Sequence, residues 1–255
     1  MDKELLLNKV AIVTGAGDGI GAETCKLFAA HGAKLVLCDI KQEALDNLLP
    51  ALKEINPDGS YLPMLVDVTN EVNIVSCVAK TKEAFGRIDI LINLAGGYFK
   101  GHKSWEADIE TFDRIISLNL RSAFLFCKAV IPQMIEQNYG KIVNTASLAA
   151  LSGRFPDSGI YAAAKGGVIS FTRHLAAEVG EFNIHVNCVA PGPTLTPRFL
   201  AVRSKEFQER FNQASALRRM SMPQDQAGGI LFLASDLSSY VTAHTLNITG
   251  GIYES

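Results

Sequence analysis

Short apolar, β-branched runs alternate with longer amphipathic stretches along the 255-residue chain. The apolar runs predict strands, which cover residues 9–15, 33–39, 61–68, 87–96, 140–147, 184–192 and 245–251. The amphipathic stretches predict helices over residues 20–31, 41–54, 70–85, 111–138, a helix that carries "YAAAK" (161–165) and ends near 182, and 223–234. Between the last two helices, the stretch 193–222 has a less regular pattern.

Most of the predicted strands read as uninterrupted hydrophobic runs, which indicates burial on both faces in a parallel sheet covered by helices. Regular alternation of strand and helix predicts a doubly wound, Rossmann-type α/β fold with right-handed crossovers. The chain has no internal repeat, low-complexity run or Pro/Ser-rich linker. Residues 1–255 are therefore predicted to form a single domain, with 193–222 as a mobile lid that orders when substrate binds.

Composition and charge narrow the classes of partner. The chain is 48% hydrophobic and 20% charged, which is ordinary for a soluble globular protein. A net charge of −2 gives no field that would attract nucleic acid or an anionic membrane. The start of the chain has too few leucines for a signal peptide, and no apolar run approaches the roughly 18 residues of a membrane span. The prediction is a cytoplasmic protein that binds neither nucleic acid nor membrane.

Cysteine and histidine spacing gives no metal or disulfide pattern. The five cysteines are odd in number, lack a C-x-x-C spacing and lie in or beside apolar segments. This pattern predicts buried free thiols in a reducing compartment. The five histidines form no H-x-x-H cluster, so we expect no metal site.

A glycine-rich segment, "TGAGDGIG" (14–21), lies between the first predicted strand and the first predicted helix. Glycines permit tight turns and close approach of a phosphate, and a helix N-terminus supplies free N–H groups for an anion. The G-x-G-x-x-G spacing from Gly15 fails at Ile20, but a G-x-G-x-x-A register runs from Gly17 to Ala22. The segment could also be only a tight strand–helix connection.

Asp39 ends the second predicted strand, 24 residues after Gly15. In the dinucleotide-binding fold an acid at this place binds the adenosine ribose hydroxyls. A carboxylate there accepts two hydrogen bonds from NAD and repels the 2′-phosphate of NADP. The glycine loop contains Asp18 and no Arg or Lys. Loop and acid together favour NAD, with capping of the next helix as the alternative role of Asp39.

These segments and several others resemble the classical type of the short-chain dehydrogenase/reductase family, and the resemblance covers nearly the whole chain. "TGAGDGIG" fits the family's T-G-x-x-x-G-x-G loop, and "DVT" (67–69) resembles its D-V segment. "NLAG" (93–96) resembles N-N-A-G with Leu94 in place of the second Asn. "APGPTLT" (190–196) resembles P-G-x-x-x-T, whereas "TGG" (249–251) departs from the more usual D-G-G.

The resemblance implies a cofactor site for NAD. It implies that the Asp67 side chain and the Val68 backbone hold the adenine, and that Thr194 and Thr196 face the nicotinamide carboxamide. The full implied set is Gly15, Asp18, Gly19, Ile20, Gly21, Asp39, Asp67, Val68, Asn93, Ala95, Gly96, Tyr161, Lys165, Pro191, Gly192, Thr194 and Thr196.

The resemblance also implies a catalytic group of Asn119, Ser147, Tyr161 and Lys165. Oxidising an alcohol requires removal of its O–H proton, and a free Tyr with a pKa of about 10 is a poor base near neutrality. An ammonium one helical turn away, together with the nicotinamide charge, should lower that pKa. Ser147 would hydrogen-bond the substrate oxygen, Lys165 would reach the nicotinamide ribose, and Asn119 would hold a water that carries the proton to solvent.

Each catalytic candidate also has a structural alternative. Asn119 could merely bridge two helical segments, and Ser147 could cap the end of a strand. Tyr161 and Lys165 could be a surface i, i+4 pair. The presence of all four in the family's order favours catalysis.

Candidate substrate-pocket residues come from Gly97, Tyr98 and Phe99, from 148–156, and from 197–220. Their apolar members predict a largely apolar pocket, with packing under loops as the alternative: Tyr98, Trp105, Leu151, Phe155, Phe199 and Leu200. Arg154 is a candidate to meet a substrate carboxylate.

The predicted function is an NAD-dependent oxidoreductase acting on a secondary alcohol or ketone. One alternative is a 3-oxoacyl-thioester reductase that uses NADPH, and another is a non-catalytic NAD-binding sensor or scaffold. Phe124, Phe126 and Val168 are candidates to pack across a two-fold axis in a homodimer or homotetramer, although packing within the chain explains them too.

Overall fold

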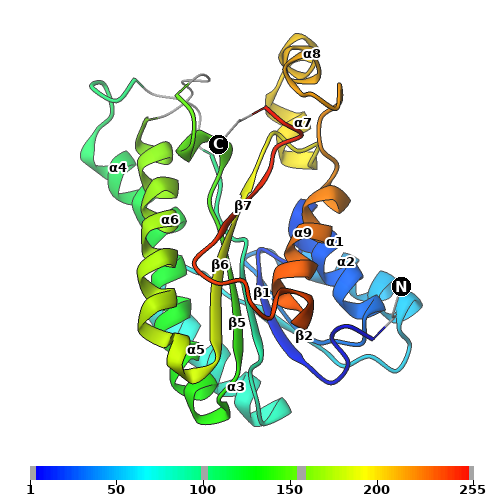
Figure 1. Ribbon diagram of the computed structural model, residues 1–255. Helices are drawn as coiled ribbons and strands as arrows, with labels where there is room; N and C mark the ends of the chain where they lie inside the picture. The colour runs from blue at the N-terminus through cyan, green and yellow to red at the C-terminus, as the bar shows by residue number, and fades with distance from the viewer. Residues whose placement is uncertain (1–3, 99–102, 154–158, 253–255) are drawn as a thin grey trace.

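The computed structural model describes residues 4–98, 103–153 and 159–252. A single sheet of parallel strands in the order β3-β2-β1-β4-β5-β6-β7 forms the middle of the molecule (Figure 1). The strands are β1 (Val10–Thr14), β2 (Lys34–Asp39), β3 (Tyr61–Leu65), β4 (Ile90–Asn93), β5 (Gly140–Thr145), β6 (Ile184–Pro191) and β7 (Thr245–Ile248). The strand order reverses between β1 and β4, where ligands bind at the carboxyl ends in open α/β sheets. The predicted doubly wound, single-domain fold is confirmed.

Helices cover both faces of the sheet. They are α1 (Gly19–Ala30), α2 (Gln42–Ile55), α3 (Glu71–Phe85), α4 (Ile109–Ile116), α5 (Ser122–Gln137), α6 (Gly159–Val179), α7 (Pro197–Val202), α8 (Lys205–Ala214) and α9 (Pro223–Ala234). Helices α1, α2 and α9 lie on one face, and α3, α5 and α6 lie on the other (Figure 1). Each face has its own hydrophobic core because both sides of the central strands are apolar and buried.

The predicted helix 111–138 is interrupted where the structure has a π-helical turn. This turn, η1 (Ser117–Arg121), joins α4 to α5. Within it, the Asn119 side chain donates a hydrogen bond to the carbonyl oxygen of Ile115 at 3.1 Å. Single π turns of this kind are frequent at functional sites. The hydrophobic pattern missed the turn because it does not change which face of the helix is apolar.

No helix is predicted over 193–222, where the sequence pattern is less regular, but this segment forms α7 and α8. Thr196 caps α7 by accepting a hydrogen bond from the Phe199 N–H, and Ser204 caps α8 in the same way through Phe207. Both helices project beyond the carboxyl end of β6 (Figure 1). Their pattern is weak because α7 is short and α8 buries only Phe211.

Helices α4 and α5 and the π turn between them form one helical stretch, Ile109–Gln137. It is long and apolar enough to cross a membrane, but 44% of its apolar window is buried inside the molecule. Its inner face, which includes Phe126 and Met134, packs in the core on that side of the sheet. The helix is therefore arranged as the core helix of a globular domain.

The residues considered for a two-fold contact separate into two groups. Phe126 and Val168 have no exposed surface and pack inside the chain, so the prediction is wrong for them. Phe124 is 45% exposed and contacts the ring of Phe171 edge-on, with 5.9 Å between centroids.

All five cysteines are buried free thiols, as the sequence predicts. They are Cys25, Cys38, Cys77, Cys127 and Cys188. Burial raises the pKa of the Cys127 and Cys188 thiols to about 12, so these two groups are poor nucleophiles.

Candidate active site

The glycine loop joins β1 to α1 and is built so that only glycine fits. Gly15 has a φ of +66°, and an added Cβ there would lie 3.1 Å from the backbone of Ala95. A Cβ on Gly21 would lie 1.9 Å from the carbonyl oxygen of Gly15. Asp18 caps α1 by accepting a hydrogen bond from the Gly19 N–H at 2.6 Å. The loop thus brings bare backbone and the N-terminus of α1 to the carboxyl edge of the sheet, beside Ile20 in the first turn.

Asp39 stands beside this loop at the end of β2. Its Oδ2 accepts a hydrogen bond from the Gly17 N–H at 2.9 Å, and its Oδ1 accepts one from the Lys41 N–H at 3.0 Å. The second bond lies at the start of α2, so the alternative role at the helix start is also present. Each carboxylate oxygen accepts more than one bond, so Asp39 can receive ribose hydroxyls without leaving the loop.

The adenine end of the predicted site is formed after β3. The Asp67 Oδ1 accepts hydrogen bonds from the Thr69 N–H at 2.8 Å and from the Thr69 hydroxyl at 2.7 Å. Among the described residues no hydrogen bond to the second oxygen is found, which leaves that atom to accept an amino group. Val68 is buried beside it at 6% exposure.

The chain that follows β4 forms the wall between the glycine loop and the catalytic candidates. The Thr14 hydroxyl oxygen accepts hydrogen bonds from the Leu94 and Ala95 N–H groups at 3.1 and 3.0 Å. Asn93 points inward instead, and its amide donates to the Asn144 side chain at 2.9 Å. Only the backbone of Asn93 is therefore available to a cofactor. Leu94 packs against the core, which explains why an apolar residue is accommodated there.

Ser147, Tyr161 and Lys165 come together where β5 ends and α6 begins. Ser147 ends the extended segment and caps a short 3-10 turn through the Ala149 N–H at 3.2 Å, so its predicted capping role is real. The same residue hydrogen-bonds Tyr161. Lys165 is 4% exposed and donates to the Thr145 carbonyl oxygen at 2.8 Å. The pair at 161 and 165 is thus an inward-facing pair, not a surface one.

Electrostatics at Tyr161 differ from the expectation. Burial raises the pKa of Tyr161, while the hydrogen bond from Ser147 and the positive charge of Arg198 lower it. The Lys165 ammonium lies 5.9 Å from the Tyr161 ring centroid, and burial lowers the pKa of Lys165 to about 8. Arg198 is therefore a cation that favours the phenolate and that the sequence did not point to, beside the predicted Lys165.

Asn119 fastens the loop after β4 to the π turn. Its Oδ1 accepts a hydrogen bond from the Gly97 N–H at 2.9 Å, and its Nδ2 donates to the Gly97 carbonyl oxygen at 3.1 Å. A Cβ added to Gly96 would lie 2.9 Å from Asn119 Oδ1 and 3.3 Å from Lys165 Nζ. Asn119 therefore joins a loop to a helical turn, and not two helical segments as its alternative role supposes, and it does so beside the catalytic candidates.

The segment after β6 closes over the glycine loop. Gly192, which follows Pro191 at the strand end, donates to the Ile248 carbonyl oxygen at 3.0 Å. Thr196 uses its hydroxyl to cap α7, and a Cβ on Gly19 would lie 2.9 Å from the Thr196 methyl carbon. The two loops that the sequence assigned to one cofactor are thus in contact.

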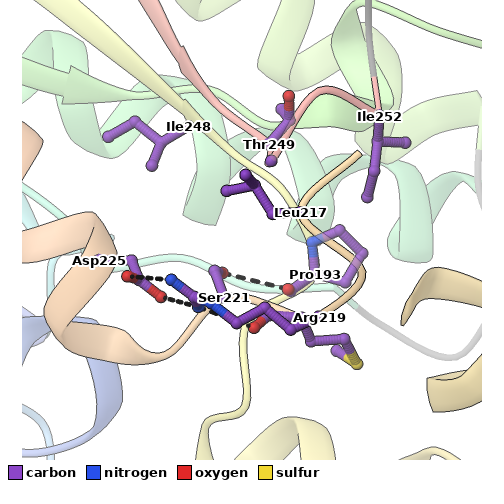
Figure 2. A pocket seen from close by; sticks show the side chains of 10 residues that line it. Pro193, Leu217, Arg219, Ser221, Asp225, Ile248, Thr249 and Ile252 are labelled. Atoms are coloured by element: carbon purple, nitrogen blue, oxygen red, sulfur yellow. Dashed lines mark hydrogen bonds and ion pairs between the residues drawn. The ribbon is translucent and has the colours of Figure 1, made fainter. Parts of the chain in front are cut away.

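A cavity of about 240 Å³ borders the Thr194 segment (Figure 2). Its lining is mainly apolar and consists of Pro193, Leu217, Arg219, Met220, Ser221, Asp225, Ile248, Thr249, Gly250 and Ile252. In its wall, Ser221 donates to the Pro193 carbonyl oxygen at 3.2 Å and lies 2.7 Å from the Thr194 hydroxyl. Gln226, which has no exposed surface, donates to Ser221 at 3.0 Å. No sequence pattern pointed to Ser221 or Gln226, because Ser221 contacts Thr194, 27 positions away, and Gln226 acts through Ser221.

Ser221→Ala is expected to weaken NADH binding about 3- to 10-fold, because the Thr194 hydroxyl then keeps only its hydrogen bond to the Gly192 carbonyl oxygen. The dissociation constant is measured by NADH fluorescence, with Ser239→Ala, an exposed serine outside the site, as the control. An unchanged affinity in Ser221→Ala would show that Thr194 needs no such support.

Only some of the candidate substrate-pocket residues lie together in the structure. Tyr98 contacts Tyr161 edge-on with 6.0 Å between ring centroids, and Phe199 is half-buried against Phe207. Trp105 is 79% exposed and Leu200 50% exposed, so neither forms an enclosed wall. Leu151 packs on the cluster around Val168, Ala190 and neighbouring residues, which is its core alternative. Phe99, Arg154, Phe155 and Pro156 lie outside the described residues.

Arg198 is a site residue that the sequence analysis did not single out. It reaches from α7 to the loop after β4, where Nη1 donates to the Gly96 carbonyl oxygen at 3.3 Å and Nη2 donates to the Tyr98 carbonyl oxygen at 2.8 Å. A Cβ on Gly97 would lie 2.2 Å from Nη1, so the guanidinium rests on bare backbone. The contact joins residues about 100 positions apart, which no local pattern reveals.

Comparison with known proteins covers the chain almost end to end. A family model described as enoyl-(acyl carrier protein) reductase matches residues 15–253. Levodione reductase of Leifsonia aquatica is 37% identical over 251 residues, 96% of this chain and 94% of the relative. A 3-oxoacyl-[acyl-carrier-protein] reductase of Thermotoga maritima is 38% identical over 247 residues, 97% and 98% of the two chains.

Solved structures that resemble this chain also include levodione reductase. A crystal structure of levodione reductase superposes with a TM-score of 0.92 at 36% identity and covers 96% of this chain and 98% of its own. A 7α-hydroxysteroid dehydrogenase complexed with NADH and 7-oxo glycochenodeoxycholic acid has a TM-score of 0.91 at 32% identity, with coverage of 98% and 97%.

Proposed function

The chain belongs to the short-chain dehydrogenase/reductase family, and from this premise we propose that it is an NAD-dependent oxidoreductase with Tyr161 as general acid and base. Its substrate is a secondary alcohol or the corresponding ketone. The observation that carries the proposal is the convergence of Ser147, Tyr161 and Lys165 beside the Gly96 backbone, next to the glycine loop.

The residues present fit a dinucleotide. Gly15 and Gly21 let the loop turn tightly, because a Cβ on either would meet backbone atoms, and the N-terminus of α1 follows directly for the pyrophosphate. Asp39 would hold the adenosine ribose and Asp67 the adenine amino group. Pro191, Gly192, Thr194 and Thr196 would form the nicotinamide end. When bound, NAD supplies the hydride acceptor, and NADH the hydride donor.

The protein groups divide the proton chemistry among them. Tyr161 gives its phenolic proton to the carbonyl oxygen of a ketone, or takes the hydroxyl proton of an alcohol in the reverse direction. Ser147 donates a hydrogen bond to the same oxygen and stabilises the charge that develops on it. With its pKa at about 8, Lys165 is mainly an ammonium at neutral pH and would hold the ribose. Asn119 keeps Gly97 in place and would support the water that carries the proton outward.

The raised pKa of Tyr161 affects ketone reduction and alcohol oxidation differently. A protonated phenol is the form that donates to a ketone, and burial favours it. Alcohol oxidation needs the phenolate, which the charges of Arg198 and of bound NAD stabilise. Oxidation should therefore rise with pH until the phenol is deprotonated.

Two other functions are alternatives to this one. A relative named as a 3-oxoacyl-[acyl-carrier-protein] reductase favours the thioester reductase alternative. Asp39 argues against it, because a carboxylate at the ribose opposes the 2′-phosphate of NADPH. A non-catalytic NAD sensor would have no need for Ser147, Tyr161 and Lys165 in one group.

The test is an absorbance assay with purified protein, NAD(H) or NADP(H), and a panel of secondary alcohols, ketones and 3-oxoacyl thioesters. NAD-restricted turnover of alcohols or ketones supports the proposal. NADPH-dependent turnover of the thioesters supports the reductase alternative. Tight NADH binding without turnover on any compound supports the sensor.

We further propose a cytoplasmic homodimer or homotetramer that uses the outer face of α5 and α6. Phe124 and Phe171 form an aromatic pair on this face, and Phe124 is exposed. Light scattering is expected to give two or four times the 27.5 kDa chain mass. A Phe124→Asp variant should lower that mass, and a monomeric wild-type protein would contradict the assembly.

A further inference from the structure

Arg198 is held rigidly although it lies at the surface of α7. Its guanidinium bridges the carbonyl oxygens of Gly96 and Tyr98, which belong to the loop after β4. The flat contact on Gly97 limits its movement further. A side chain fixed in this way has already lost its rotamer freedom, so a ligand that binds it does not incur that cost.

No acid among the described residues balances the charge of Arg198. In the part of the chain that the structure describes, no carboxylate lies within ion-pair distance of it, whereas Arg87 and Arg219 are each paired with an aspartate. A guanidinium carries five N–H donors in a planar fork, and the two carbonyl oxygens occupy two of them. The remaining donors are enough for a bidentate bond to a carboxylate.

The position of this cation ties it to the reacting group. Gly96 and Tyr98, which hold the guanidinium, contact the catalytic group on their other side: Gly96 lies against Lys165, and the Tyr98 ring meets the Tyr161 ring. The field of Arg198 reaches the Tyr161 hydroxyl. A substrate whose oxygen meets Tyr161 would therefore place its neighbouring substituents near Arg198.

We propose that Arg198 is a specificity residue that binds a carboxylate of the substrate, so that the enzyme acts on hydroxy acids and oxo acids. The inference rests on the proposed oxidoreductase function and adds the substrate class to it. A second nearby cation, Arg203, does not serve this role, because it lies over the rings of Tyr98 and Phe207 at 4.9 and 4.2 Å.

Arg198 could instead act only on Tyr161, by favouring its phenolate. The two roles differ in a measurable way. Loss of a carboxylate contact affects acids and spares their neutral esters, whereas loss of the field at Tyr161 lowers turnover of both by the same factor. The ratio of the two activities therefore isolates the role in recognition.

The kinetic test compares oxo acids with their methyl esters in the NADH-dependent reaction of the full chain. Wild type should prefer the acid, and Arg198→Gln should lower the acid-to-ester ratio of kcat/KM about 10- to 100-fold. Arg198→Lys should recover part of it, because it keeps the charge without the fork. Arg210→Gln, which removes an exposed arginine of α8, is the matched control and should leave the ratio unchanged. An unchanged ratio in Arg198→Gln overturns the proposal.

A binding test separates this proposal from the oxidoreductase function itself. Benzoate and benzamide are titrated into wild type and Arg198→Gln by calorimetry, with and without NADH. Benzoate should bind wild type at least about 10-fold more tightly than benzamide does, and Arg198→Gln should remove the difference. Equal binding of the two compounds to wild type overturns the carboxylate role even where turnover is normal. Selective benzoate binding without turnover of any panel compound supports carboxylate binding at Arg198 and counts against the oxidoreductase function.

Discussion

Tyr161→Phe is expected to lower kcat by about 10²- to 10⁴-fold while the NADH dissociation constant changes by less than about threefold. The phenylalanine ring keeps the edge-on contact with Tyr98, so the cleft retains its shape. What is lost is the hydroxyl that Ser147 bonds and that would exchange a proton with the substrate oxygen. Initial rates by NADH absorbance and binding by NADH fluorescence measure the two quantities separately.

Tyr139→Phe is the matched control, because it also removes a partly buried phenolic hydroxyl, at a site away from the cleft. Tyr139 donates to Asp236 at 3.1 Å, so this variant should lose some stability and keep its kcat. Robust turnover in Tyr161→Phe would refute the assignment of Tyr161 as general acid and base. A parallel loss of NADH binding would instead indicate that the ring change disturbs the cofactor site.

The fold could be predicted from the sequence because each strand of a buried parallel sheet appears in the chain as a local hydrophobic pattern. Strands β1 and β4 are buried along their whole length and appear as continuous apolar runs. Ends were less accurate, since the predicted strand 87–96 shortens to Ile90–Asn93. At its end the backbone leaves the sheet although Leu94 and Ala95 are apolar and pack against the cores, and such packing outside a strand looks the same in sequence as packing inside one.

The residues proposed as catalytic could be predicted from the sequence for a different reason. Tyr161 and Lys165 lie one turn apart on α6, and Ser147 precedes them at a strand end, so motif order alone brings them to one edge of the sheet. The residues that were missed act over long sequence distances. Arg198 bonds residues about 100 positions away, and Gln226 reaches Thr194 only through Ser221. Such contacts exist only once the fold is assembled.

Apolar character alone also failed to separate packing from exposure. Phe124 and Phe126 are two positions apart on α5, yet the first is 45% exposed and the second has no exposed surface. The helical period places them on different faces, but it does not tell which face meets the sheet. Trp105 lies outside the helices and is large and apolar, yet it is exposed, so its apolar character did not predict burial in a pocket.

Asp39→Ala combined with Ile40→Arg is expected to move the preference of the enzyme from NAD toward NADP. Removing the carboxylate takes away the acceptor for the ribose hydroxyls, and each hydrogen bond to a charged group contributes about 1.5–3 kcal/mol, or roughly 10- to 100-fold in kcat/KM for NAD. Ile40 is 64% exposed directly beside Asp39, so an arginine there can reach a 2′-phosphate. The ratio of kcat/KM for the two cofactors is the measurement.

Asp39 also holds the glycine loop, and this second role has to be separated from cofactor choice. Asp39→Asn keeps an oxygen for the Gly17 N–H at 2.9 Å but loses the charge and the acceptor for the Lys41 N–H, so it should weaken discrimination against NADP with a moderate loss of stability. Asp39→Ala loses both acceptors, and its thermal midpoint should fall further. Glu54→Ala, which removes an exposed carboxylate from the end of α2, should change neither quantity. A wild-type enzyme that already uses NADPH as readily as NADH would contradict the role of Asp39, because its charge would then exclude nothing.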